Sequence, residues 1–599
     1  GQCWSSDVCS SDLTWRNISA HPATELRFHL YWNAWRNADS TFMRERRRAG
    51  TGAAPARGEA SVDVTRLRVG HGSNTDDLTA RLAFIAPDDG NTGDRTAASV
   101  PLPTPVEPLD TVTIDIDWVA RAPRTVARTG YRGNYYFIGQ WFPKIGVLDD
   151  EGWNVHQFHA STEFYADYGD YDVRITAPQS FVVGATGVET RSTVRPDGTT
   201  VHQFHADDVH DFAWVASPTL VVRERAFAEP GLPPVRLRLF LQPEHRDQED
   251  RFFRSASAGL RAYGRWFGPY PYEQLTIVDA AYQSGSGGME YPTLVTASTR
   301  WLAPRDVAAP ESAVAHEVGH QFWYGLVASN EVEHGWMDEG LTHFSESRLY
   351  DNGAIGEVLV RRFFGGLIPW TFPDIRVTRP MEEGVAGYRR DATTDDLATP
   401  TFRYAPATGY SITYNKTALW LHTLERWLGW PWLQTRLSDY FTAWTFRHPG
   451  PEDLLARLRE GAPPDMPRFL DDVFGSKTFD YGVETLTNTT RSAGGFHTTV
   501  VARRFGDATF PIEVETRFED GSTRTERWDG VARRVTYEYD GRSRATSAQT
   551  DPRRVLMLDT HLTNNSVSLR PSTDAASTKW SLTWMAWLQD VLLTFASLA

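Results

Sequence analysis

Hydrophobic and polar positions alternate with a period of two residues through the first third of the chain. The segments TVTIDIDW (111–118) and YDVRITAP (171–178) show this alternation, and stretches rich in Pro, Gly and Asp, such as APDDGNTGD (86–94), separate such segments. The pattern predicts half-buried strands joined by turns. We therefore expect residues 14–237 to form an N-terminal antiparallel β domain, a sandwich or saddle.

The middle of the chain has a mixed pattern. Residues 247–268 repeat apolar positions with helical spacing and end at a Gly-Pro pair, whereas QLTIVDA (274–280) has the pattern of a strand. Further helices are predicted over 311–327, 338–350 and 415–428. We expect a mixed α/β domain over residues 238–486, with the preceding boundary near AEPGLPP (228–234).

Two-residue alternation returns in the last part of the chain. FPIEVETRFEDGSTRTERWDG (510–530) contains two alternating runs joined at an Asp-Gly pair, which is typical of a β-hairpin. A small C-terminal β-sandwich is therefore predicted over residues 487–570.

The tail, residues 571–599, is expected to include a helix with Trp580, Trp584 and Trp587 on one face. Gln589 and Asp590 interrupt its short apolar run. Packing against protein, or the cut edge of a longer chain, is thus favoured over association with a membrane.

The composition is that of a globular protein of several domains, with 599 residues, 41% hydrophobic and 23% charged. The formal net charge of −15 argues against nucleic acid as a partner, because nucleic acid rewards a basic surface. Both cysteines, Cys3 and Cys9, lie in GQCWSSDVCSSDL (1–13), a near-repeat without apolar periodicity. We expect residues 1–13 to be an artefact of translated adaptor sequence, outside the fold, which leaves no disulfide or cysteine ligand.

The segment ESAVAHEVGHQFWYGLVASNEVEHGWMDEGLTHFSE (311–346) carries the candidate chemistry. His316 and His320 are four residues apart, so a helix presents both imidazoles on one face, where they can share a Zn²⁺ ion. Glu317 is turned by about 100° from His316. Its carboxylate is therefore expected beside the metal, where it can take a proton from water as a general base.

A catalytic zinc needs a third protein ligand. In one class of enzymes that ligand is a histidine six residues after the second, but this position holds Leu326. Glu339 follows His320 by 19 positions, enough for one helix to end and a second to turn back, so we assign it as the third ligand. Asp338, His343 and Glu346 are the next candidates; a buried helix with satisfied polar residues is the alternative to a metal site.

These residues resemble the aminopeptidase N family of zinc metallopeptidases, the gluzincin aminopeptidases that include leukotriene hydrolase. The resemblance rests on HEVGH, on Glu339 within WMDEGL, and on GGME (287–290) before them. FGPYPYEQLTIVD (267–279) is similar to the segment that leads into the family's catalytic sheet, and ITYNKTALWLHTLE (412–425) to its tyrosine helix. The match implies a thermolysin-like catalytic domain and one Zn²⁺ per chain.

The resemblance also implies roles for single residues. Tyr414 matches a tyrosine whose hydroxyl hydrogen-bonds the oxyanion of the tetrahedral intermediate. Glu290 matches the carboxylate that binds the substrate's α-amine, and Gln140 aligns with a polar residue of the N-terminal domain that helps to hold this amine.

The glycine-rich stretch before Glu290 is interpreted as a rail for the bound peptide. Gly287 and Gly288 lack side chains and let the backbone approach a peptide, and Met289 begins an extended segment, MEYPTL, that can pair with it as an edge strand. Tyr291 stands where the family usually has asparagine, so the resemblance does not carry over a substrate preference.

The sequence thus predicts a zinc-dependent aminopeptidase that hydrolyses N-terminal residues from peptides with a free N-terminus. One alternative is a zinc endopeptidase of the same fold, which needs no carboxylate for the α-amine. Another is an inactive scaffold or binding protein, although it would be expected to lose Glu317 or a ligand first. Similarity to bacterial exported members suggests an extracytoplasmic location, in the periplasm, the cell envelope or the medium.

The hexapeptide VHQFHA occurs twice, at 155–160 and 201–206. His-x-x-His suggests a metal site, but in an extended strand His156 and His159 point to opposite faces, as do His202 and His205. Structural or surface histidines are therefore favoured over a second metal site.

Overall fold

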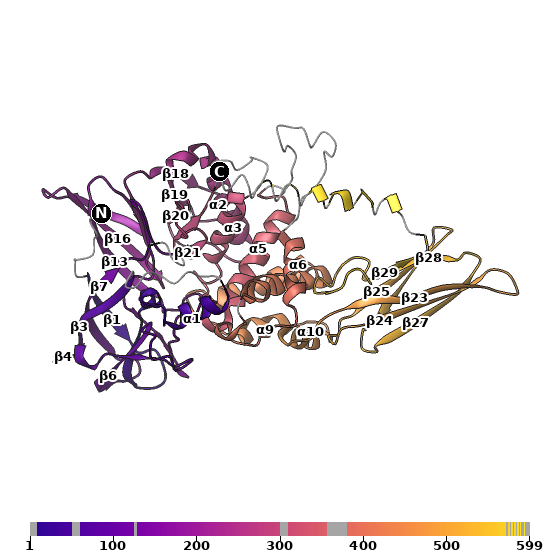
Figure 1. Ribbon diagram of the computed structural model, residues 1–599, viewed down its shortest axis with the longest axis horizontal. Helices are drawn as coiled ribbons and strands as arrows, with labels where there is room; N and C mark the ends of the chain where they lie inside the picture. The colour runs from indigo at the N-terminus through magenta and orange to yellow at the C-terminus, as the bar shows by residue number, and fades with distance from the viewer. Residues whose placement is uncertain are drawn as a thin grey trace.

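The computed structural model describes residues 9–50, 60–72, 74–124, 128–299, 309–355, 380–405 and 407–570, with single residues of the tail beyond. Figure 1 shows β-sheets of the N-terminal part at one end, helices in the centre, and a slender β part at the other end. This is the multidomain α+β architecture that the alternating and helical patterns predict. The three parts are called the N-terminal, central and C-terminal regions below.

Two four-stranded antiparallel sheets build most of the N-terminal region, in the orders β1-β7-β3-β4 and β10-β2-β6-β5. The strands are β1 (Cys9–Arg16), β2 (Ala23–His29), β3 (Ser61–His71), β4 (Asn74–Asp77), β5 (Ala83–Ile85), β6 (Ala97–Val106), β7 (Thr111–Arg121) and β10 (Lys144–Ile145). Alternate residues, such as Leu26 and Phe28 of β2 or Ile114 and Ile116 of β7, are buried in one apolar cluster. The apolar residues that alternate along each strand thus lie on the buried face of its sheet.

Strand β1 contains residues that we expected to lie outside the fold. Cys9 pairs with Trp118 and Leu13 with Ile114 of β7. Because backbone groups make these ladder bonds, an edge strand needs no apolar periodicity of its own. Residues 9–13 therefore belong to the sheet and not outside the fold, while residues 1–8 lie outside the described part of the chain. The adaptor origin of residues 1–13 stays a prediction.

Two smaller sheets, in the orders β13-β16-β15 and β14-β17-β9-β8, and a two-stranded sheet of β11 (Val147–Asp149) and β12 (Gly152–Asn154) complete the N-terminal region. Their strands are β8 (Gly130–Arg132), β9 (Tyr135–Ile138), β13 (Gly169–Pro178), β14 (Val182–Ala185), β15 (Val188–Val194), β16 (Thr199–Val209) and β17 (Trp214–Ser217). The helix α1 (Thr41–Arg48) is capped by Ser40, whose hydroxyl accepts from the Met43 amide.

A five-stranded sheet of order β18-β19-β20-β22-β21 forms the floor of the central region. Its strands are β18 (Val221–Phe227), β19 (Val235–Leu241), β20 (Gln274–Asp279), β21 (Met289–Tyr291) and β22 (Leu294–Ala297). β19, β20 and β22 run parallel, and β21 lies antiparallel at the edge. The sheet begins at Val221, so it reaches back past the boundary placed at residue 237 from the sequence.

Helices pack on this sheet and on one another through one continuous apolar core. They are α2 (Glu249–Trp266), α3 (Ala309–His320), α4 (Glu331–His334), α5 (Glu339–Asp351), α6 (Pro380–Asp391), α7 (Thr417–Leu428), α8 (Trp430–Trp444), α9 (Pro451–Arg459) and α10 (Met466–Phe474). The predicted end of α3 at residue 327 is wrong, because the helix ends at His320. Tyr324 has a φ of 85°, outside the helical region, and Asn330 already caps α4.

The C-terminal region is the predicted β-sandwich, with sheets β23-β24-β27 and β26-β25-β28-β29. Its strands are β23 (Tyr481–Thr490), β24 (Phe496–Arg504), β25 (Ile512–Phe518), β26 (Thr523–Trp528), β27 (Arg534–Gly541), β28 (Ala545–Thr550) and β29 (Ser566–Ser568). β25 and β26 form the hairpin expected around Asp520 and Gly521.

The described residues beyond 572 are helical. Trp580 and Trp584 are exposed, and their ring centroids lie 6.1 Å apart. Trp587 and most of the tail lie outside the described residues. Among the residues that the structure describes, none of the helices combines the length and apolarity needed to span a membrane.

Candidate functional site

Helices α3 and α5 bring His316, His320 and Glu339 together. The Nε2 atoms of His316 and His320 lie 3.1 Å apart, and each is 3.2 Å from Oε2 of Glu339. Three ligand atoms on a tetrahedral zinc are expected about 3.3 Å apart, since zinc binds such atoms at about 2.05 Å. The spacing thus fits the ligand set assigned from the sequence.

The other nitrogen of each imidazole faces a carboxylate. His316 Nδ1 lies 3.2 Å from Glu346 Oε2, and His320 Nδ1 lies 2.6 Å from Asp338 Oδ1. A carboxylate accepts, so each Nδ1 donates its proton, and the Nε2 atoms of both rings point at Glu339 Oε2. In the neutral rings, the two Nε2 atoms and Glu339 Oε2 form a set of three ligand atoms that a metal cation can share.

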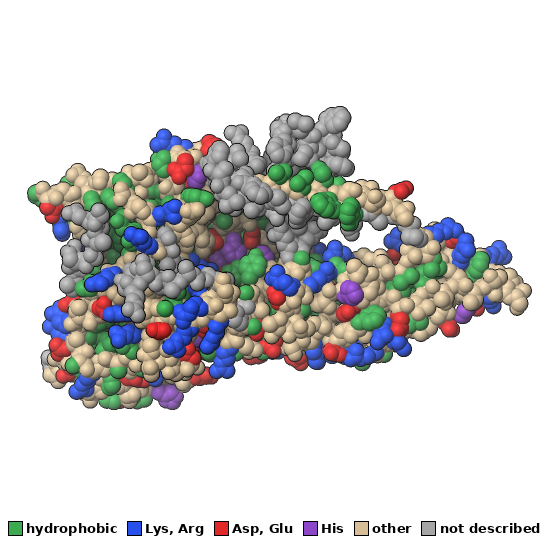
Figure 2. All heavy atoms as spheres, viewed as in Figure 1, with side chains coloured by type: hydrophobic (Ala, Val, Ile, Leu, Met, Phe, Trp, Pro, Cys, Tyr) green, Lys and Arg blue, Asp and Glu red, His purple; other side chains and the backbone are tan. Residues whose placement is uncertain are grey.

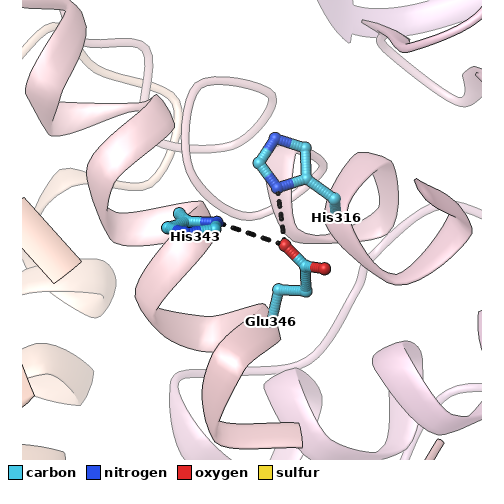
Figure 3. Close-up of side chains that lie close together, drawn as sticks. All are labelled: His316, His343 and Glu346. Atoms are coloured by element: carbon cyan, nitrogen blue, oxygen red, sulfur yellow. Dashed lines mark hydrogen bonds and ion pairs between the residues drawn. The ribbon is translucent and has the colours of Figure 1, made fainter. Parts of the chain in front are cut away.

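Glu346 joins a second histidine to this arrangement. Figure 3 shows His316 and His343 pointing at the same oxygen of Glu346, at 3.2 and 3.3 Å. The Ser312 hydroxyl donates to the other oxygen at 2.5 Å. Burial alone would raise the pKa of Glu346, but the hydrogen bonds from the two histidines lower it. Glu346 is thereby kept charged and orients His316. It therefore positions a candidate metal ligand and is not itself one of the three converging ligands.

Two further carboxylates lie beside His320. One oxygen each of Glu290 and Glu317 lies with a ring nitrogen of His320 within a span of 4.8 Å. Both glutamates are buried, and burial raises the pKa of both. Figure 2 shows histidine and acidic side chains at the floor of a hollow near the middle of the molecule. His320 thus lies between the three converging ligand atoms and two further carboxylates.

Strand β21 explains why Glu290 and its neighbours differ in environment. Side chains alternate along a strand, so Glu290 faces α3 while Met289 and Tyr291 face the other way. Met289 and Tyr291 belong to the apolar cluster of the N-terminal region, and Tyr291 contacts Gly139 and Phe137 there. The side chain of Met289 is therefore part of the core, and the expected pairing with a peptide concerns its backbone alone.

The strand itself is shorter than the sequence suggests. MEYPTL is not one extended segment, because Pro292 and Thr293 turn the chain into β22. The predicted edge position of β21 is nevertheless confirmed. Gly288 has a φ of +75°, and a Cβ there would lie 3.7 Å from Glu317 Oε1, whereas a Cβ on Gly287 would collide with Ser298. A glycine at 288 thus keeps the space beside Glu317 open.

Tyr414 enters the site from the π-helical turn Tyr410–Lys416 that precedes α7. Its hydroxyl donates to Oε1 of Glu339, and its ring stacks on His316 at 5.9 Å between centroids. Burial and the charge of Glu339 raise the pKa of Tyr414 well above its ordinary value, so the hydroxyl stays protonated and can donate.

Gln140 does not lie in the site as expected. It is 1% exposed; its amide nitrogen donates to Asp211, and its amide oxygen accepts from Lys144 Nζ at 2.8 Å. A buried residue whose polar atoms are already paired has no surface to offer a substrate. The weak alignment of GQWFPKIG was misleading here.

Two residues of the N-terminal region do reach the site and were missed. The carboxylate of Glu163 pairs with the guanidinium of Arg128, and the charges of both act on Glu290. Neither residue belongs to a motif with fixed spacing, and both are far from α3 in sequence. Only the docking of the N-terminal region on the central sheet brings them close.

The two copies of VHQFHA behave differently. In β16, His202 contacts Glu189 while His205 contacts Asp172, as expected for opposite faces. In the first copy the chain is not a strand, and His156 and His159 both contact Asp88. The prediction of opposite faces is wrong there because it assumed an extended backbone.

The profile of the peptidase family M1 domain matches residues 255–474, a range that includes Glu290, α3, α5 and Tyr414. Residues 255–474 form a peptidase family M1 domain.

Curated relatives of this chain are similar over a limited length. A leukotriene A-4 hydrolase homolog from Botryotinia fuckeliana is 29% identical over 177 residues, which are 29% of this chain and 25% of that protein. Leucine aminopeptidase 2 from Sclerotinia sclerotiorum is 28% identical over 177 residues, 29% of this chain and 27% of that protein. The matched segment thus spans about a quarter of the length of these relatives.

Solved structures share the fold of this chain over a larger part. Aminopeptidase A from Legionella pneumophila, in complex with aspartic acid, superposes with a TM-score of 0.59 at 13% identity, covering 84% of this chain and 56% of that one. A variant of the M1 zinc metallopeptidase from Deinococcus radiodurans gives a TM-score of 0.52 at 17% identity, covering 78% of this chain and 90% of that one.

Proposed function

We propose that the chain is a zinc aminopeptidase that releases N-terminal residues from peptides. The observation that carries the proposal is the convergence of His316 Nε2, His320 Nε2 and Glu339 Oε2 at 3.1–3.2 Å, with Glu290 beside them. When bound by these three atoms, Zn²⁺ supplies Lewis acidity, which lowers the pKa of water and polarises a carbonyl group.

Protein groups around the three ligands have distinct parts in this proposal. Glu317 takes a proton from the attacking water and later delivers it to the leaving amine. Tyr414 donates a hydrogen bond to the carbonyl oxygen as negative charge develops on it. Asp338 and Glu346 accept hydrogen bonds from the Nδ1–H groups of His320 and His316. They thereby keep both imidazoles in the tautomer whose Nε2 can bind a metal.

Glu290 is what favours an aminopeptidase over an endopeptidase. A zinc endopeptidase needs the ligands and the base but no further buried carboxylate. Glu290 is 4% exposed, and no basic side chain is within hydrogen-bond distance of its carboxylate among the hydrogen bonds and ion pairs of the described residues. A protonated α-amine would supply a direct, charged hydrogen-bond donor to this carboxylate. The relatives named leucine aminopeptidase, and the Deinococcus enzyme whose structure contains the substrate Tyr-Ser-Ala, support this choice.

Metal dependence tests the proposal. We expect the purified protein to hydrolyse leucyl-aminocoumarin, to lose this activity after dialysis against a chelator, and to regain it at one Zn²⁺ per chain. Activity that survives complete removal of zinc would contradict the proposal. Cleavage within a peptide chain, with no release of the first residue, would favour the endopeptidase.

A further inference from the structure

Strand β21, which carries Glu290, is held from two sides. On the side of the central region, the side-chain amide of Gln321 donates to the carbonyls of Glu290 and Tyr291 at 3.4 and 3.1 Å. Gln321 is buried and directly follows His320, the last residue of α3. The backbone of the strand is thus tied to the end of the helix that carries two of the three candidate metal ligands.

On the side of the N-terminal region, the ring of Tyr291 fills a space that a glycine leaves open. Tyr291 is 3% exposed, and a Cβ on Gly139 would collide with its hydroxyl oxygen and with Cζ of its ring. The ring of Phe137 lies beside it, at 5.8 Å between centroids. Glycine at position 139 is therefore what allows the ring of Tyr291 to lie there.

Hydrogen bonds fix the backbone of Gly139 in turn. The indole N–H of Trp32 donates to the Gly139 carbonyl at 2.9 Å, and the Gly139 N–H donates to the Thr129 hydroxyl at 3.1 Å. Trp32 and Thr129 are both buried. Because both polar groups of the Gly139 backbone are bonded to buried side chains, a firmly held part of the N-terminal region sets the position of the Tyr291 ring.

Tyr291 and Glu290 are neighbours on a strand of only three residues, so their side chains point to opposite faces. A displacement of the Tyr291 ring therefore shifts the backbone that carries the Glu290 carboxylate. We propose that Tyr291 is a positioning residue, which sets the place of this carboxylate beside the candidate metal ligands and thereby the affinity for the substrate's α-amine. The inference rests on the proposed aminopeptidase function.

Three variants displace or keep the ring. Tyr291→Leu withdraws it from Gly139 and leaves the position apolar, so KM for leucyl-aminocoumarin is expected to rise about tenfold while kcat changes by less than about threefold. Gly139→Ala displaces the same ring from a residue outside β21, and is expected to raise KM as well. Tyr291→Phe keeps Cζ against Gly139, and its KM is expected to stay within about twofold of wild type.

Coupling to Glu290 separates positioning from a general structural effect. If Tyr291 acts through Glu290, Tyr291→Leu has no carboxylate to displace in a Glu290→Ala background, and KM is expected to change there by less than about twofold. Phe28→Leu is the matched control, because it shortens a buried ring of the same apolar cluster, on β2 of another sheet. We expect its KM to equal that of wild type, although its midpoint temperature of unfolding decreases as it does in Tyr291→Leu.

Two failures can be told apart. If wild type does not hydrolyse leucyl-aminocoumarin, the proposed function is wrong. If it does, but Tyr291→Leu or Gly139→Ala folds and retains the wild-type KM, the inference alone is overturned. An equal rise in KM with and without the Glu290 carboxylate, or an equal rise in Phe28→Leu, would also overturn it, because a general loosening of the core would then be the cause.

Discussion

At the scale of single residues, Glu317 is a buried carboxylate beside the metal ligands, with one oxygen unpaired among the described residues. It is 4% exposed, and its Oε2 lacks a hydrogen-bond partner within the described part of the chain. An unpaired buried oxygen is costly for a fold and is typical of a group that acts on a substrate. The general-base assignment supplies the reason for this arrangement.

Glu317→Gln keeps the size of the side chain but cannot accept a proton. We expect kcat for leucyl-aminocoumarin to fall by about 10²–10⁴-fold, the usual contribution of a positioned acid or base. Zinc content, measured by elemental analysis, is expected to stay near one per chain because Glu317 is not a ligand. Wild-type turnover in this variant would show that the base is another group.

The same scale shows how far sequence reasoning reaches into the site. His316, His320 and Glu317 follow from helical periodicity, and Glu339 from the spacing of two helices. Glu163 could not be found this way, because its closeness to α3 depends on the packing of two regions. The burial of the Met289 side chain could have been predicted, since a strand that points Glu290 at α3 points its neighbours away.

At the scale of elements, close contact of α5 with the turn that precedes α7 sets Glu339 against Tyr414. A Cβ on Gly340 would lie 2.3 Å from Thr417 Cβ and 2.6 Å from the Thr413 carbonyl. Only glycine allows this approach, next to the proposed third ligand. The absence of a side chain at position 340 therefore sets the distance between α5 and this turn.

Gly340→Ala is expected to push α5 away from this turn. Overpacking of this kind destabilises a protein by about 1–3 kcal/mol, and here it should also reduce kcat by separating Tyr414 from the ligands. Thermal unfolding and hydrolysis of leucyl-aminocoumarin measure the two effects. Gly409→Ala is the control, because a Cβ at Gly409 meets nothing within 4 Å. Equal behaviour of the two variants would contradict this role for Gly340.

Element order was largely predictable, and element ends were not. Alternation located β7, β13 and the β25–β26 hairpin, since each buries one face. The end of α3 was not predictable because the left-handed backbone of Tyr324 leaves no periodic pattern in the sequence. The strand β1 was not predictable because it is defined by its pairing with β7, which leaves no such pattern either. The boundary predicted at residue 237 lies inside the central sheet for the same reason: β18 joins this sheet through backbone pairing.

At the scale of the whole molecule, a cluster of charges joins the N-terminal and central regions. His156 lies 2.7 Å from Asp88 and 3.1 Å from Glu333 of α4, and His159 lies 2.7 Å from Glu45 and 3.0 Å from Asp88. Each ring nitrogen faces a carboxylate, so both rings are doubly protonated in the folded state. Burial alone would lower the pKa of both histidines, but these contacts raise it to about 9.

This cluster predicts a loss of stability at alkaline pH. A pKa raised in the folded state contributes stability that is complete below the unfolded value of about 6.5 and is lost as pH rises through about 9. The contribution is on the order of 3 kcal/mol for each histidine. We expect the midpoint temperature of thermal unfolding to decrease as the pH is raised from 6.5 to 9. In Asp88→Asn the decrease over the same pH range is expected to be smaller. The same pH dependence in both proteins would remove the cluster as its cause.

The central claim is that a buried carboxylate beside the zinc makes the enzyme act on the first residue of a peptide. Mass spectrometry of a tripeptide and its N-acetylated form, each incubated with wild type and with Glu290→Ala, tests it most directly. The account predicts that wild type releases the first residue from the free peptide only, and that Glu290→Ala does so at least about tenfold more slowly with zinc retained. Equal cleavage of the free and acetylated peptides by wild type would contradict it.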